Sequence, residues 1–168
     1  IEFLWEEIYM KKISSIILIL VIVSFFNPLL AATIKWSMPG DSLTLDPHAQ
    51  NEGPTHMVSR QVYETLVTRG VDMSLEPQLA TSWKANDPET WVFTLRDGVV
   101  FSNGTKFNAS DVVFSINRAL SGASDVKELI ESIVSVQALN AKTVQIKTKG
   151  PNPILLNQLS QIFIMSES

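Results

Sequence analysis

The chain has 168 residues, a formal net charge of −4 at pH 7 and 45% hydrophobic residues, which is typical of one globular domain or of part of a larger protein. The mild acidity disfavours a nucleic-acid partner, because a phosphate-binding face needs clustered Lys and Arg. The sequence contains no cysteine, which excludes disulfides, a thiolate nucleophile and Cys-based zinc sites.

Residues 10–32 read MKKISSIILILVIVSFFNPLLAA and have the parts of a secretory signal peptide. Two lysines form a positive n-region, a long apolar core follows, and the small residues Ala31 and Ala32 come after a break at Asn27-Pro28. A permanent membrane anchor is the alternative, because the apolar stretch approaches spanning length. The proline break and the polar chain that follows favour a cleaved signal peptide.

Export implies that the mature fold begins near Thr33. Residues 1–9 precede Met10, the only plausible start, and we interpret them as an upstream or non-native segment. No cysteine follows the apolar core, so the exported protein is not expected to be a lipoprotein.

The first predicted elements are a strand and a helix. Residues 33–38 (TIKWSM) alternate apolar and polar side chains, which predicts a half-buried strand. A polar loop follows. Residues 55–67 then place Val58, Val62 and Leu66 four positions apart, which predicts a helix opening near Thr55.

After Gly70 the pattern becomes that of short strands. Segments 82–87 and 90–96 flank an Asp-Pro turn and predict a hairpin, and segments 132–140 and 142–148 predict a second one. Between them, an Asn-Ala-Ser-Asp capping box at 108–111 opens a predicted helix with one apolar face. Short helices are expected within residues 125–132 and after the prolines near 151. Five aromatic side chains are expected to form a small core: Trp91, Phe93, Phe101, Phe107 and Phe114.

Motifs that would carry chemistry are few. His48 and His56 are separated by a proline-containing loop and have no evident third ligand, so packing or surface histidines are favoured over a metal site. Three carboxylates, of Asp41, Asp46 and Glu52, share one loop, which either binds a cation or an amine or is merely solvated. A secreted hydrolase using the region of Asp46 and His48 is a remote alternative, because no nucleophile motif accompanies them.

Three motifs occur in a fixed order: LDP at 45–47, EPQLATSW at 76–83, and FTLRDGVVFSNGTKFNASDVVFSINRA at 93–119. Together they make the sequence from about 33 to 165 resemble family 5 of the bacterial extracellular solute-binding proteins, the receptors of peptide, dipeptide and nickel ABC importers. Members of that family are much longer, so the chain resembles their N-terminal third.

The resemblance implies an α/β, two-lobed periplasmic binding protein of class II type, of which only part of the first lobe and most of an extra small domain are present. Residues 33–66 would begin the first lobe, and residues 67–168 would form the truncated extra domain. The loop after the LDP motif contacts the peptide in peptide-binding members. Here that loop comprises Asn51, Glu52, Gly53 and Pro54.

The implied function is that of a periplasmic receptor that binds di- or oligopeptides and delivers them to an inner-membrane ABC permease. Nickel chelates, haem or another solute are alternative cargoes. The resemblance implies no catalysis, no cofactor, no nucleic-acid partner and a monomer. Glu52 would receive a ligand amine if it points into the cleft, and it would be a solvated loop carboxylate otherwise.

Overall fold

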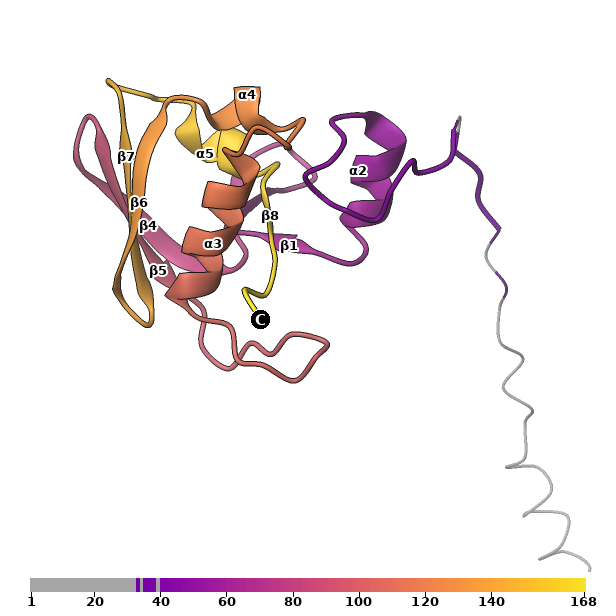
Figure 1. The fold of residues 1–168 in the computed structure, drawn as a ribbon, viewed down its shortest axis with the longest axis horizontal. Coiled ribbons are helices and arrows are strands. Elements are labelled where there is room, and N and C mark those ends of the chain that lie inside the picture. The colour runs from indigo at the N-terminus through magenta and orange to yellow at the C-terminus, as the bar shows by residue number, and fades with distance from the viewer. Residues whose placement is uncertain (1–32, 34, 39) are drawn as a thin grey trace, which may run out of the picture. The chain divides into compact units, whose positions relative to one another are not determined.

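The computed structural model describes residues 33, 35–38 and 40–168, and Met38–Ser168 form one compact unit (Figure 1). The predicted signal peptide at 10–32 and the segment 1–9 lie outside the described residues. Within the described part of the chain, no helix is both long and apolar enough to cross a bilayer.

The prediction of a strand at residues 33–38 is wrong for the residues that the structure describes there. None of them belongs to a strand, and the side chain of Trp36 is 62% exposed. Alternation of apolar and polar residues makes a strand only where a neighbouring strand supplies hydrogen bonds. None of the described strands pairs with this segment.

A four-stranded antiparallel sheet organises the unit. Its strands are β4 (Ala80–Asp87), β5 (Thr90–Leu95), β6 (Ile133–Asn140) and β7 (Thr143–Thr148), in the order β4-β5-β7-β6 (Figure 1). Both predicted hairpins are therefore confirmed, with β4 paired to β5 and β6 paired to β7. The central pairing of β5 with β7 joins the two hairpins.

Helix α3 (Ala109–Ala119) packs on β6 and β7. Its capping box is confirmed: the Asn108 side chain accepts a hydrogen bond from the Ser110 N–H at 2.7 Å, and Asp111 Oδ2 accepts one from the Asn108 N–H at 2.9 Å. Val112 and Ile116 are fully buried on the apolar face. The cap and this face explain why the helix begins where the sequence predicts.

The predicted aromatic core is only partly present. Phe93 and Phe107 are fully buried, and Phe101 meets Phe107 edge-on with ring centroids 6.0 Å apart. Trp91 packs against the same cluster. Phe114 is the exception, because it lies on the outer side of α3, remains half-buried and is not part of the hydrophobic core cluster.

The helix predicted over 55–67 is shorter than expected. Helix α2 spans Gly53–Ser59, and the chain then forms β1 (Glu64–Thr65) and β2 (Val67–Arg69). Val62, expected on the buried stripe, is 67% exposed. Strand β1 gains a partner about a hundred residues away, in residues 163–164, and β2 gains one in residues 75–77. This pairing overrides the local helical spacing.

The remaining elements close the unit. Strand β3 (Leu75–Pro77) pairs with β2, and the short helices α4 (Lys127–Ile130) and α5 (Leu155–Leu159) pack together. Strand β8 (Phe163–Ile164) pairs antiparallel with β1. This pairing connects residues 64–65, which precede the sheet and α3, to residues 163–164.

Candidate functional site

The four residues of the predicted ligand loop lie where the chain enters α2. Asn51 and Gly53 are exposed, and Glu52 and Pro54 are half-buried. A Cβ placed on Gly53 would meet no atom within 4 Å. The structure thus brings these four residues together at the surface, with backbone that another molecule can approach.

Glu52 has a structural role that the sequence analysis missed. Its Oε1 accepts a hydrogen bond from the Thr55 N–H at 2.9 Å, so it caps the N-terminus of α2. A carboxylate at this position stabilises the free amides and the positive end of the helix dipole. Glutamate is not a common cap residue, and the helix begins two residues before the start near Thr55 that the spacing of apolar residues predicts.

The carboxylates of Asp41, Asp46 and Glu52 do not converge. Asp46 forms a bidentate pair with Arg118, with contacts of 2.9 Å from Nη1 to Oδ1 and 2.5 Å from Nη2 to Oδ2. The Arg118 hydrogen bonds hold the pKa of Asp46 below its ordinary value. In the described part of the chain, no group of three or more His, Asp or Glu side chains is arranged to hold a metal ion.

His48 is buried and joins the loop to two distant segments. Its Nε2 lies 3.0 Å from the carbonyl oxygen of Phe163, and its own carbonyl oxygen accepts from the Asp125 N–H at 3.0 Å. Burial lowers the pKa of His48, so the neutral ring donates Nε2–H to the Phe163 carbonyl. Asp46 Oδ1 accepts a hydrogen bond from the backbone N–H of His48 at 3.0 Å. A carboxylate that orients a catalytic histidine would instead bind a nitrogen of the imidazole ring.

Comparison with known proteins identifies the family. The profile described as "Bacterial extracellular solute-binding proteins, family 5 Middle" matches residues 74–168. The chain belongs to this family. It is 31% identical over 133 residues to the periplasmic murein peptide-binding protein MppA of Escherichia coli, covering 68% of this chain and 25% of that protein. It is 32% identical over 120 residues to the glutathione-binding protein GsiB of Escherichia coli, covering 70% of this chain and 23% of that protein.

Solved structures of family 5 proteins have the same fold over most of the described residues. The murein tripeptide-binding protein MppA of Escherichia coli superimposes with a TM-score of 0.71 at 26% identity, over 77% of this chain and 30% of that one. NikZ of Campylobacter jejuni, solved with Ni(L-His), superimposes with a TM-score of 0.66 at 30% identity, over 74% of this chain and 25% of that one. The chain therefore spans about a quarter of the length of these relatives.

Membership in family 5 confirms the α/β fold class expected from the resemblance, that of a two-lobed periplasmic binding protein. Within and just after the LDP segment, Asp46 and His48 act as packing groups: Asp46 binds Arg118, and His48 binds the backbone of β8. Their contacts stabilise the loop that leads to Asn51.

The stability of this family 5 unit is expected to fall as the pH drops below 6.5. His48 has a pKa below its ordinary value of 6.5 because burial disfavours its charged form, and His56 is shifted in the same direction. The folded state therefore binds fewer protons than the unfolded state. Its stability is complete above pH 6.5 and is lost as the pH falls towards the lowered values. Asp46, whose pKa is lowered from 3.8, adds a further loss only under more acidic conditions.

Thermal unfolding between pH 8 and pH 5 tests this dependence. His48→Gln removes the titration while leaving an amide N–H that can donate to the Phe163 carbonyl, so the melting temperature of the variant should vary less with pH. His56→Gln is the matched control, and it should have the smaller effect because His56 is less buried and its ring makes no hydrogen bond with the described residues. An unchanged pH profile in His48→Gln would show that His48 is not the titrating group.

Proposed function

We propose that a protein carrying this sequence at the length of its relatives is a periplasmic receptor that binds di- or oligopeptides and delivers them to an inner-membrane ABC permease. The observation that carries the proposal is the match to MppA, named for binding murein peptides, over 68% of the chain. GsiB, named for glutathione, adds a second relative with a peptide ligand. The role requires binding and release and no catalysis.

The proposed ligand site includes the backbone from Asn51 to Pro54 and the carboxylate of Glu52. Backbone groups in an exposed loop bind the main chain of a peptide, which tolerates differences in peptide sequence. Gly53 leaves room for close approach. Glu52 uses Oε1 to cap α2, and its second oxygen would accept a hydrogen bond from the ammonium group of the peptide.

Glu52→Gln is expected to weaken binding of peptides with a free amino terminus by about 1 kcal/mol or more, because a charge-assisted hydrogen bond is lost. Glutamine keeps an oxygen that can cap α2, so the loop should retain its conformation. The measurement is titration calorimetry on the protein at the length of its relatives, with free-amine and N-acetylated forms of one peptide.

Glu89→Gln, an exposed change of the same type in the turn between β4 and β5, is the matched control. If Glu52→Gln leaves the affinities for both peptide forms unchanged, Glu52 does not belong to the site. If neither form binds the parent protein at all, the peptide-receptor proposal itself fails.

A nickel chelate is the second candidate ligand. The likeness to NikZ, whose solved complex contains Ni(L-His), is the observation that favours it. The same calorimetry with Ni²⁺ and histidine separates the two ligand classes. If the protein binds the chelate and not peptides, the proposed ligand becomes the nickel chelate, and the family membership is unaffected.

We also propose that residues 10–32 are removed on export, that residues 33–66 begin the first lobe and that residues 67–168 belong to the extra domain. The expected mature N-terminus is Ala32 or Thr33, since a small-residue end follows the apolar core. N-terminal sequencing of the periplasmic fraction checks the cut. Recovery of uncleaved protein in the membrane fraction would instead support a permanent anchor.

A further inference from the structure

The segment 43–55, which contains the proposed ligand loop, is closed at its base by Thr55. The N–H of Leu43, at the start of the segment, donates to Thr55 Oγ1 at 3.1 Å. The N–H of Thr55 in turn donates to Glu52 Oε1 at 2.9 Å. Thr55 is only 1% exposed. It is therefore a buried point at which the two ends of a compact loop meet.

His48 fixes the segment on the other side of the ligand loop. Besides the contact of its ring with β8, its carbonyl oxygen accepts from the Asp125 N–H at 3.0 Å and from the Ser124 hydroxyl at 3.3 Å. His48 is 1% exposed, like Thr55. Residues 51–54 therefore lie between two buried, hydrogen-bonded positions, and their conformation depends on both.

Asp46 sets the turn that leads to His48. Its N–H donates to Thr44 Oγ1 at 3.0 Å, and its Oδ1 accepts from the His48 N–H at 3.0 Å. The two oxygens of the same carboxylate also accept from Arg118. A bidentate pair with a guanidinium fixes the orientation of a carboxylate as well as its distance. Arg118 thus holds, from outside the segment, the side chain that shapes its turn.

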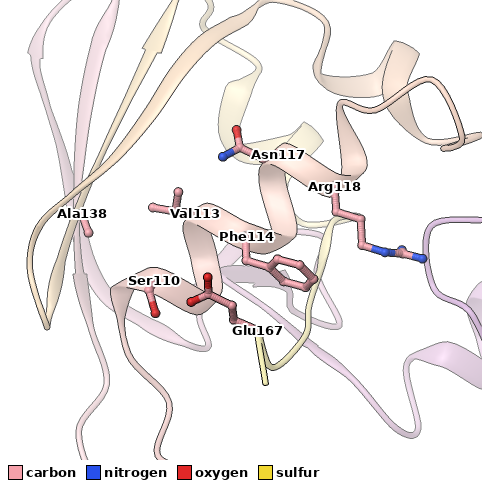
Figure 2. Close-up of a pocket in the computed structure, with 7 residues that line it drawn as sticks. All are labelled: Ser110, Val113, Phe114, Asn117, Arg118, Ala138 and Glu167. Atoms are coloured by element: carbon pink, nitrogen blue, oxygen red, sulfur yellow. The ribbon is translucent and has the colours of Figure 1, made fainter.

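Arg118 is itself held on a well-anchored element. It lies in the last turn of α3, the helix with the capping box and the buried apolar face, where a cation also interacts favourably with the helix dipole. Figure 2, which draws the residues that line a groove beside α3, shows the Arg118 side chain leaving the helix on the side opposite Val113 and Ala138. The guanidinium therefore reaches the loop from a rigid support.

We propose that Arg118 is a positioning residue for the ligand loop: through Asp46 it holds residues 51–54 in the conformation that binds a peptide. The inference rests on the peptide-receptor function proposed above. A loop already held in its bound conformation loses less conformational entropy when the ligand binds. Residues 67–168, proposed above as the extra domain, thereby contribute to peptide affinity without contacting the peptide.

Arg118→Gln, in the protein at the length of its relatives, is expected to raise the dissociation constant of the peptide about fivefold. The expected effect is modest because the side chains of the pair are 32% and 34% exposed. Titration calorimetry with the free-amine and N-acetylated forms of one peptide is the measurement. Both affinities should fall by the same factor, because Arg118 touches neither form. Glu52→Gln, by contrast, should affect the free-amine form alone.

A double variant tests whether Arg118 acts through Asp46. Asp46→Asn keeps an oxygen that can accept from the His48 N–H but loses the charge that binds Arg118. The double variant should bind peptide as weakly as each single variant, since all three break the same pair. Additive losses would overturn the proposal. Lys142→Gln, which breaks the surface pair with Asp97, is the matched control and should leave the affinity unchanged.

Hydrogen exchange without ligand gives a readout that does not depend on the peptide. In Arg118→Gln, exchange should become faster in peptides that cover residues 43–55, while the amides of β5 and β7 remain protected. Unchanged exchange in this segment would overturn the proposal. Faster exchange with unchanged affinity for both peptide forms would also overturn it. If the parent protein binds neither form, the peptide-receptor function fails, and the exchange comparison still decides whether Arg118 holds the loop.

Discussion

Phe163→Ala is expected to lower the free energy of unfolding by about 3–5 kcal/mol, the usual cost of removing a buried aromatic ring. Phe163 is 1% exposed, yet it does not belong to the main hydrophobic core cluster. Its ring is surrounded by side chains from α2 and the residues that follow it. His56 and Tyr63 lie 5.7 and 6.1 Å away between ring centroids, and the Arg60 guanidinium lies 5.9 Å above the ring.

The same residue connects the loop before α2 to the rest of the unit. Its carbonyl oxygen lies 3.0 Å from His48 Nε2, and its strand pairs with β1 at Thr65. Loss of the ring should therefore loosen residues 48–65 more than the four-stranded sheet. Hydrogen exchange should show faster exchange in the former segment while the amides of β5 and β7 remain protected.

Phe114→Ala is the matched control, since it makes the same change at a half-buried ring outside the core cluster. Chemical denaturation of both variants gives the comparison. Similar losses in the two variants would contradict the inference that Phe163 is the main attachment of the loop.

Asp111→Ala is expected to lower the free energy of unfolding by about 2–3 kcal/mol, because it removes a helix cap and leaves two partly buried N–H groups without an acceptor. Asp111 is 4% exposed. Its Oδ2 accepts from the Asn108 N–H and its Oδ1 accepts from the Glu167 N–H, both at 2.9 Å. One carboxylate therefore joins the start of α3 to the segment after β8.

Asp111→Asn should give an intermediate loss, because the amide keeps one oxygen as an acceptor. Asp97→Ala removes an exposed carboxylate that pairs with Lys142 at the surface, and it should leave stability unchanged within error. Thermal or urea unfolding measures all three variants. If Asp111→Ala is as stable as Asp97→Ala, the carboxylate contributes little to the capping box.

Much of the region from β4 to β7 could be predicted from local sequence. Each hairpin has its alternating strands and its turn within a short stretch, and the capping box at Asn108 and Asp111 lies within four residues. Interactions of this kind are encoded by neighbours in the chain. The order of strands in the sheet was not predicted, because pairing of β5 with β7 depends on contacts across about fifty residues.

The candidate ligand loop could be located but not described from the sequence. The resemblance pointed to Asn51–Pro54, and the structure places them together at the surface. The cap made by Glu52 escaped prediction because glutamate is uncommon at that position and the helix was expected to start later. The pairing of Asp46 with Arg118 likewise has no local signature, since 72 positions separate the two residues.

By itself, the sequence determined the family, the two hairpins, the capped helix α3 and the position of the loop, because periodicity, turn residues and short motifs express local preferences. Only the tertiary structure decided that α2 ends at Ser59, that β1 pairs with β8 and that Asp46 and His48 are packing groups. These outcomes depend on partners distant in the chain. A helical spacing of apolar residues gives way wherever such partners satisfy the backbone and bury the side chains better.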